Sequence, residues 1–567
     1  MSESTFSFDV SATPFSQFGS YLSILRCDGP GSLGAGLYLR VHRARGVGVR
    51  DAILIEPLID GQACQATATG RPDVLTLDGG GGRSVEICFA DDESLRIRGR
   101  GMGLRFRTEP GTTVVAQPME GGRWSVNVRP ALCRFMFEAL RGSVRVDAPW
   151  RPNHCQHVIL DLLPEAGQLD AAIDAYQSTW VPRQRGDFDQ ARAAARHDFQ
   201  AWLDSTPPAP SKLKRAWEHA AYVNWSATVY PLGFLRRPAV LMSKVVMDQV
   251  WSWDNCFNAM ALCYGQPQLA WDQLLVVADH QDEFGAFPDG LNPSFRHYNF
   301  CKPPVMGWAL DFMLQRRPDF VTPRRLLEIY DPLCRWSRWW LAHRTAGNEH
   351  LPYYLHGNDS GWDNSTMFDA GAPLVAPDLA AILSTQLAVA GKIAGLLGKD
   401  RESAHWHELS QEMLDALVGQ LWRGDRFVAK RLADGFEVDC DSLVPMVPLV
   451  LGKRLPCQLA DALVQRLPKF LTPHGLATEL TTSPHYTPDG YWRGPIWAPP
   501  TLLIVDGLRQ LGRSDLARDI ARRFCATCAA GGFAENFDAV SGAALRDTAY
   551  TWTSSVFLIL AHEYLQT

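Results

Sequence analysis

Short segments in which apolar and polar residues alternate fill the first part of the chain. Segments such as "DAILIEPLID", "SLRIRGRG" and "RWSVNVRP" have a period of two, and Gly, Asp and Pro separate them. This period places successive side chains on opposite faces of a strand, and turn residues at this spacing are typical of a β-sandwich. The pattern predicts a β-sandwich domain over residues 1–165, with "HVILDLLPEAG" as its last strand.

A different period begins at "QLDAAIDAYQSTW", where apolar residues stand three and four positions apart. This spacing puts them on one face of a helix and predicts a helical linker over residues 166–210. Over residues 211–567, helix-like segments recur, with loops rich in Gly, Trp, Asp and Pro between them. A solenoid would repeat its loops, and these loops differ from one another. We therefore expect a closed toroid of paired helices whose loops line a pit at one end.

Composition and charge narrow the function classes. The residues are 46% hydrophobic and 20% charged, and the net charge of −6 gives no electrostatic reason to expect nucleic acid or a membrane as partner. We expect no apolar run of membrane-spanning length. Thirteen Cys without a recognisable export signal predict reduced thiols and a cytoplasmic location. The chain shows no dinucleotide fingerprint, Walker loop or HExxH, and one CxxC lacks a second pair, so we expect no cofactor and no metal.

Five loops of the helical region combine Trp with carboxylate, amide or guanidinium groups. The faces of Trp rings stack on the apolar faces of pyranose rings, and Asp, Asn and Arg bind sugar hydroxyls. The candidate substrate-binding residues in these loops are Trp251, Trp253, Asp254, Asp289, Asp359, Trp362, Trp492, Arg493, Trp497 and Trp552. Such a set predicts a small neutral carbohydrate as ligand. For any single loop, helix capping combined with core Trp residues is the alternative.

The stretch "HGNDSGWDNSTMFD" is the densest of these loops, with Asp359, Asp363 and Asp369. Asn, Asp, Ser and Gly favour turns and disfavour helix interiors. An N-cap cluster is one alternative reading of this stretch. A calcium loop through Asp359 and Asp369 is another, although the spacing of an EF-hand is missing.

Five segments, taken in order, resemble the (α/α)6-barrel glycosidases of glycoside hydrolase family 63. They are "VWSWDN", "GAFPDG" with "KPPV", "DSGWDNS", "GYWRGPIWAPP", and "AENFDAVSG" with "YTWTSS". The similarity spans about residues 245–560, and "SGWDNS" and "YWRGPIW" are its most specific parts. A more distant resemblance is to the trehalases of family 37. The resemblance implies a multidomain α and β protein, with a β-sandwich followed by an (α/α)6 toroid as catalytic domain.

Carried over to this chain, the resemblance implies that Asp363 is the general acid and that Glu535 is the general base. Trehalases have Pro-Asn-Gly at residues 288–290 and lack Tyr491-Trp492-Arg493, and many relatives have Glu at position 359. These departures put trehalose as the substrate in doubt and leave both proposed catalytic carboxyls in place.

Glycoside cleavage needs one protonated and one ionised carboxyl. We expect Trp362 to shelter Asp363 and raise its pKa, and we expect a wetter setting for Glu535. The resemblance implies inversion of configuration, with about 6.5–9.5 Å between the carboxyls. The sequence thus predicts an exo-acting glycosidase that releases glucose from small α-glucosides. Alternatives on the same scaffold are an α-mannosidase, a glycosyl-glycerate hydrolase and a phosphorolytic transferase; a catalytically inactive sugar-binding protein is a fourth.

Overall fold

The computed structural model describes residues 6–29, 31–43, 50–110, 113–345 and 350–566. Its contacts divide the chain into two compact units. The first unit consists of Met1–Asp204, Ala221–Asp248 and Asn292–Phe295, and the second of Ser205–Ala220, Gln249–Leu291 and Arg296–Thr567.

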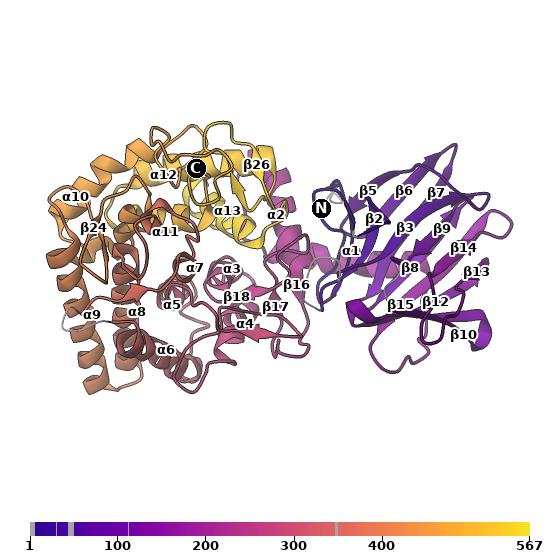
Figure 1. Cartoon of the computed structure of the whole chain (residues 1–567), viewed down its shortest axis with the longest axis horizontal. Coiled ribbons are helices and arrows are strands. Elements are labelled where there is room, and N and C mark those ends of the chain that lie inside the picture. Colours follow the sequence, from indigo (N-terminus) through magenta and orange to yellow (C-terminus); the bar gives the residue numbers. More distant parts are fainter. Residues whose placement is uncertain (1–5, 30, 44–49, 111–112, 346–349, 567) are drawn as a thin grey trace. The chain divides into compact units, whose positions relative to one another are not determined.

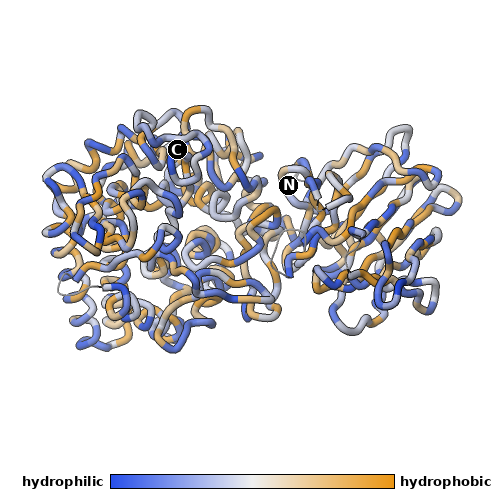
Figure 2. The backbone as a smooth tube through the Cα atoms, in the orientation of Figure 1, coloured by the Kyte–Doolittle hydropathy of each residue, from blue (hydrophilic) through white to orange (hydrophobic). Residues whose placement is uncertain are grey.

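The first unit contains two antiparallel β-sheets (Figure 1). One sheet has the strand order β10 (Val114–Met119), β11 (Arg123–Val128), β12 (Cys133–Arg141), β15 (Gln168–Tyr176), β8 (Ser94–Arg100), β7 (Arg83–Asp91), β6 (Val74–Gly80), β5 (Thr67–Arg71). The other has the order β1 (Leu22–Cys27), β2 (Gly36–Val41), β3 (Asp51–Ile59), β9 (Gly103–Arg107), β14 (Ile159–Leu163), β13 (Ser143–Asp147), with β4 (Gln62–Ala63) beside β3. Polar and apolar residues alternate along these strands (Figure 2). The predicted β-sandwich region is confirmed.

The prediction of a helical linker over residues 166–210 is wrong in its first part. Residues Gln168–Tyr176 form strand β15, which lies between β12 and β8 in the larger sheet. The apolar residues of "QLDAAIDAY" fit a period of two as well as a helical period, and pairing with two strands decides for the sheet. A helix, α1 (Phe188–Ser205), follows, and Phe188 packs against Val74 and Cys88 of the same sheet.

The second unit is built from helices whose contacts form a ring. In the described part of the chain, α3 contacts α5, α5 contacts α8, α8 contacts η6, η6 contacts α11, α11 contacts α13, and α13 contacts α3. The ring helices are α3 (Asp254–Leu262), α5 (Met306–Arg316), α8 (Pro377–Leu396), η6 (Val444–Arg454), α11 (Ala498–Gln510) and α13 (Thr551–Tyr564). Helix α3 begins within "WSWDN", which the sequence predicted as a loop.

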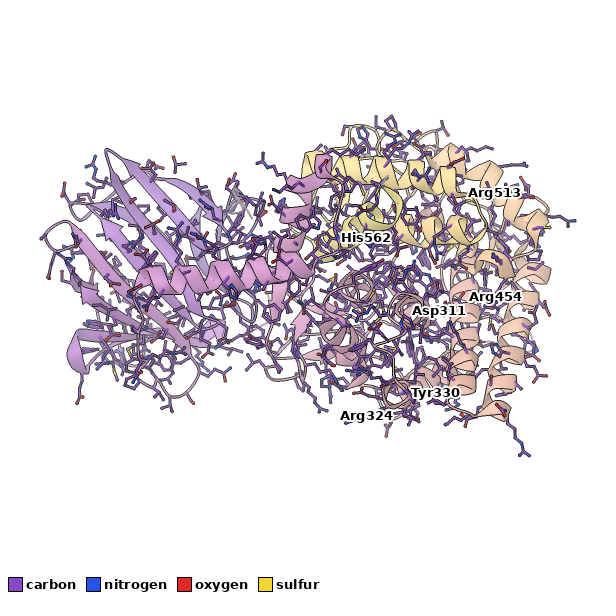
Figure 3. The ribbon with its side chains drawn as sticks, turned by 180° about the vertical axis from the view of Figure 1, so that it is seen from behind. Asp311, Arg324, Tyr330, Arg454, Arg513 and His562 are labelled. Atoms are coloured by element: carbon purple, nitrogen blue, oxygen red, sulfur yellow. The ribbon has the colours of Figure 1, made fainter. Side chains whose placement is uncertain are left out.

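Other helices alternate with the ring helices along the chain and pack on them (Figure 1). They are α4 (Pro267–Ala278) on α3, α6 (Pro323–His343) and α9 (Asp400–Leu421) on α8, α10 (Cys457–Arg466) on η6, and α12 (Ser514–Gly531) on α11. Helix α2 (Lys214–Ala227) begins in the second unit and ends in the first. The guanidinium of Arg454, labelled in Figure 3, donates hydrogen bonds to Ser384 Oγ of α8 and Ser410 Oγ of α9 at 2.8 and 2.7 Å.

Helix α8 corrects the expectation that no apolar run reaches membrane-spanning length. Within the described residues it is long and apolar enough, by length and composition, to cross a membrane, and 72% of its apolar window is buried inside the structure. Helices α5, α6, α9 and η6 all pack against it. A helix surrounded in this way is apolar on every face.

Candidate active site

In the sequence, the predicted site residues precede the ring helices or belong to their first turns. All of them are in the second unit. Asp254 is the first residue of α3, Trp497 is the N-cap of α11, and Trp552 lies in the first turn of α13. Lys302 stands four residues ahead of α5. Motifs that are far apart in the sequence therefore take similar positions relative to the ring.

The ammonium of Lys302 lies beside Asp289 and within the electrostatic influence of Asp254 and Asp363. Lys302 Nζ lies 3.4 Å from Asp289 Oδ1, and the negative charges of all three carboxyls act on it. Burial raises the pKa of Asp254 well above its ordinary value and that of Asp289 to about 6, while Lys302 partly offsets both shifts. Burial also opposes the charge of Lys302, but the carboxylates outweigh it and its pKa is raised.

The acid loop, residues 356–369, depends on two glycines for its shape. Gly361 has φ +73°, and a Cβ there would lie 2.4 Å from the ring of Trp253. A Cβ on Gly357 would lie 1.9 Å from the carbonyl oxygen of Asp363. Asp363 itself is half-buried, so it is less enclosed than we expected. The ring of Trp362 packs on Trp492, with ring centroids 4.9 Å apart.

Asp359 is buried within the acid loop, and both its carboxylate oxygens accept hydrogen bonds from the protein. Oδ1 accepts one from the Cys301 N–H at 3.0 Å, and Oδ2 accepts one from the Leu355 N–H at 2.9 Å and one from Arg344 Nη1 at 2.8 Å. These bonds fix the loop to its neighbours. Because both oxygens of Asp359 already accept hydrogen bonds from the protein, substrate binding by Asp359 stays a prediction.

The second candidate calcium ligand, Asp369, forms an ion pair with Arg493. In the ranges that the structure describes, no group of three or more His, Cys, Asp or Glu residues is arranged to hold a metal ion. With Asp359 and Asp369 both paired with arginines, the calcium alternative loses its two candidate ligands.

Asn364 and Arg493 join the acid loop to the "GYWRGPIW" loop. Asn364 Oδ1 accepts a hydrogen bond from the Trp492 N–H at 2.9 Å, and Asn364 Nδ2 donates one to the Gly490 carbonyl at 3.0 Å. Arg493 Nε donates to the Asn364 carbonyl at 2.7 Å. The two most specific motifs of the sequence thus form one hydrogen-bonded structure.

The tryptophans of these loops form a continuous aromatic cluster. Trp492 and Trp497 stack with ring centroids 3.9 Å apart and an interplanar angle of 7°, and Trp552 lies 5.5 Å from Trp497. Trp253 packs edge-on against Trp552 at 5.8 Å. Trp492 and Trp497 are each 1% exposed, so truncating either would leave a core cavity that costs about 3–5 kcal/mol. Because the two rings stack on each other, one face of each is covered by the other. Contact between these rings and a sugar stays a prediction.

Glu535 precedes β25 (Asn536–Phe537), which pairs with β26 (Ala544–Leu545). The side chain is 7% exposed, and the Glu535 N–H donates a hydrogen bond to the Asp547 carbonyl at 2.7 Å. Burial, and then the charge of Asp547, raise the pKa of Glu535 to about 7, against the opposing effects of Arg546 and a hydrogen bond from Tyr491. The expectation of a wetter setting for Glu535 is wrong, because this hairpin and Tyr491 cover it.

Tyr491 forms a hydrogen bond to Glu535 and is within the electrostatic influence of Asp363. Burial, followed by the charges of Glu535, Asp363 and Asp254, raises the pKa of its hydroxyl. Its backbone has φ +64°, a left-handed conformation that residues with a Cβ rarely adopt and that is often found at functional sites. Asp363 and Glu535 therefore belong to one electrostatic cluster.

Sequence reasoning missed two members of this cluster, Tyr491 and Lys302. Lys302 stands in "KPPV", a segment used above for the family resemblance, and Tyr491 stands in "GYWRGPIW". These two segments pointed to the site, but neither a Lys nor a Tyr by itself indicates a position close to carboxyl groups.

Several buried polar atoms in these loops have no hydrogen-bond partner among the described residues. They are Nε1 of Trp251, Nε1 of Trp552, Oδ1 of Asp289, and both Oδ1 and Nδ2 of Asn536. Trp251 is half-buried and meets His297 edge-on, with ring centroids 5.4 Å apart. Buried polar atoms are nearly always hydrogen-bonded. Such exceptions also occur outside these loops, as at Arg43, Thr108 and Trp340; the atoms in the loops are donors and acceptors that a ligand can use.

Residues 247–553 match a family model described as "Mannosylglycerate hydrolase MGH1-like glycoside hydrolase domain". The match covers more than half of the chain and includes Asp363 and Glu535. The protein is thus a glycoside hydrolase. Within that class, the chain belongs to the mannosylglycerate hydrolase MGH1-like family, and the resemblance to family 63 glycosidases is confirmed.

Two relatives are about a fifth to a quarter identical to this chain over the aligned residues. The mannosylglycerate hydrolase of Rubrobacter radiotolerans is 22% identical over 398 residues, which are 54% of this chain and 89% of that protein. The periplasmic trehalase of Pseudomonas aeruginosa is 24% identical over 339 residues, which are 49% of this chain and 60% of that protein.

Two solved structures show the same fold. The family 63 mannosylglycerate hydrolase of Thermus thermophilus in complex with glucose has a TM-score of 0.54 at 19% identity, and the match covers 60% of this chain and 98% of that chain. A bacterial glucoamylase complexed with acarbose has a TM-score of 0.60 at 10% identity, and the match covers 98% of this chain and 94% of that chain. The glucoamylase match extends over almost the whole of this chain.

Proposed function

We propose that the protein is an exo-acting, inverting glycosidase that releases glucose from the non-reducing end of small α-glucosides. Asp363 acts as general acid and Glu535 as general base. The observation that carries this proposal is the position of Tyr491, whose hydroxyl is affected by the charges of both carboxyls. Two carboxyls near one point are the chemical requirement of glycoside hydrolysis.

The proposal includes the architecture around these carboxyls. The helices of the second unit form an (α/α)6 toroid over residues 211–567, and the β-sandwich precedes it. Support comes from the closed order of helix contacts and from the regular alternation of ring helices and covering helices along the chain.

The charge of the site favours a neutral aglycone. Asp254, Asp289 and Asp363 face one ammonium, that of Lys302, and Arg546 acts on Glu535. Arg493 and Arg344 are already paired with carboxylates. A carboxylate on the substrate would add to this surplus of negative charge. The unpartnered buried atoms of Trp251, Trp552 and Asn536 are instead suited to the hydroxyl groups of a neutral sugar.

A glycosyl-glycerate is the second candidate substrate, because the matching family and several relatives carry the name mannosylglycerate hydrolase. The similarity to a trehalase favours an α-glucosyl group instead. A cytoplasmic location is part of the proposal, and the thirteen cysteines, all free thiols, support it.

The decisive experiment is proton NMR during the first minutes of hydrolysis, before the released sugar mutarotates. An α-glucoside hydrolysed with inversion gives β-glucose first. Early α-glucose would contradict the proposal and would require a carboxylate nucleophile at about 5–5.5 Å from the acid. A parallel panel of α-glucosides, α-mannosides, trehalose and mannosylglycerate, with and without phosphate, distinguishes the substrates and identifies a phosphorolytic reaction.

A further inference from the structure

Lys302 makes contacts that the proposed catalytic and sugar-binding roles do not account for. Its side chain is 7% exposed, so an ammonium is held almost out of water. Lys302 Nζ donates a hydrogen bond to the Asn358 carbonyl of the acid loop and lies 3.4 Å from Asp289 Oδ1. It also lies 5.7 Å from the ring centroid of Trp251. One cation thus touches three of the loops that make up the site.

The carboxyls around Lys302 outnumber it. The groups that face it or its partners are Asp254, Asp289, Asp363, the Asp359–Arg344 ion pair next to Cys301, and His297, whose Nδ1 is 3.5 Å from Asp289 Oδ2. Arg344 is committed to Asp359, so Lys302 is the cation that acts on all three remaining carboxyls. The 3.4 Å contact with Asp289 is an ion pair without hydrogen-bond geometry, because Asp289 Oδ1 has no hydrogen bond.

We propose that Lys302 is a positioning residue that acts as the shared counter-ion of the Asp254, Asp289 and Asp363 carboxyls and holds the Asp289 loop and the acid loop together. This inference rests on the proposed function for its consequence in catalysis. One positive charge balances only part of the negative charge that the three carboxyls carry when they are ionised. The raised pKa of Asp254 and the pKa of about 6 for Asp289 agree with this.

The test compares Lys302→Met, Lys302→Gln and Lys302→Arg by their melting temperatures at pH 5 and pH 8. At pH 5 the carboxyls bind protons and need no counter-ion, so Met and Gln should cost little. At pH 8 the ionised carboxyls are left without a cation, so both variants should melt at clearly lower temperature than the wild type. Lys302→Arg keeps the charge and should behave like the wild type at both pH values.

An equal loss at pH 5 and pH 8 would overturn the proposal, because it would mean that Lys302 matters only through its hydrogen bond to Asn358. If Lys302→Met does not fold at either pH, the double variant with Asp289→Asn should restore folding, and failure to do so would also overturn it. The matched control is Lys392→Met, which removes an exposed lysine paired with Asp311 at 2.6 Å (Asp311 is labelled in Figure 3). That variant should show no pH-dependent loss.

Activity provides the second measurement. Loss of the cation lets neighbouring carboxyls keep a proton to higher pH, so the alkaline limb of kcat/KM in Lys302→Met should move up by about one pH unit. An unmoved alkaline limb with an active enzyme would contradict the proposal. If the wild type hydrolyses no glycoside, the proposed function fails, while the melting temperatures still decide the role of Lys302.

Discussion

Two sets of buried carboxyls, one in each unit of this protein, behave in opposite ways. In the first unit, Asp73 is paired with three arginines, Asp161 with two, and Asp174 with Arg185 and Arg183. Burial alone would raise the pKa of each carboxyl, but the arginines outweigh it and the pKa is lowered. In the second unit, Asp254, Asp289 and Glu535 are buried with too few cations, and their pKa is raised.

The difference shows how the same residue type serves stability in one unit and chemistry in the other. A buried carboxylate with two arginines is fixed in its ionised form and stabilises the fold near neutral pH. A buried carboxyl that lacks such partners opposes folding when ionised, yet it can exchange a proton near neutral pH. The comparison predicts that substitutions in the two groups have opposite effects on activity and stability.

The largest effect is expected for Glu535→Gln. Without a base to activate water, hydrolysis should fall by roughly 10³–10⁴-fold, the upper part of the range for general acid–base catalysis. Folding should be retained, since a neutral amide is easier to bury than a carboxylate. Measurements of kcat/KM and melting temperature check both parts. If Glu535→Gln is active but unstable, Glu535 stabilises the fold as Asp73, Asp161 and Asp174 do, and the contrast between the two sets of carboxyls is wrong.

A smaller loss of activity is expected for Asp363→Asn, about 10²-fold on natural glycosides. Aryl glycosides with good leaving groups need less protonation and should retain more activity, whereas Glu535→Gln should be inactive on both substrate types. The ratio of the two rates in each variant is the measurement. Equal losses on both types of substrate would show that Asp363 does not protonate the leaving group.

Asp174→Asn should reverse the pattern. Asp174 accepts hydrogen bonds from Arg185 Nη2 at 2.7 Å and from Ser94 Oγ at 2.6 Å. Loss of its charge leaves Arg185 with Glu138 as its remaining carboxylate partner, at a cost on the order of 2 kcal/mol in the free energy of unfolding. Denaturant titration measures this cost, and kcat/KM should not change. Asp515→Asn, at a fully exposed side chain, is the control and should alter neither quantity.

The smallest expected effect is a pH dependence of stability. The pKa of Glu535 is raised from 4.5 to about 7 in the folded protein. Its contribution to stability is therefore present below pH 4.5 and is lost as pH rises through about 7. The melting temperature of Glu535→Gln should accordingly rise relative to that of the wild type between pH 5 and pH 8. A constant difference would mean that Glu535 is already ionised at pH 5.

The sequence predicted those parts of the fold in which one period dominates. Strand β3 lies within "DAILIEPLID", which the sequence predicted as a strand. In β15, Leu169, Ala171 and Ile173 are spaced by two, yet Leu169, Ala172 and Ile173 also fit a helix. The choice depends on β8 and β12, which are distant in the sequence, so no local pattern could make it.

The site shows the same limit. The loops could be predicted because Trp, Asp and Gly are concentrated in them. The burial of the catalytic carboxyls could not be predicted. The segment "DSGWDNS" does not show that Asp363 is half-buried, and "FAENFD" does not show that Glu535 is enclosed by a hairpin and Tyr491. The roles of Lys302 and Tyr491 depend on charges contributed by distant segments.

The division of the chain into units also bears on the order in which the protein is made. The first unit includes Asn292–Phe295, and the Phe234 N–H donates a hydrogen bond to the Pro293 carbonyl at 3.1 Å. A ribosome must therefore translate the Trp251 and Asp289 loops of the second unit before the first unit is complete. Domains usually fold in turn from the N-terminus during synthesis. Here a truncated chain that ends at residue 248 lacks part of its own sandwich-containing unit, so the folding of this unit is completed only after residue 295 has been translated.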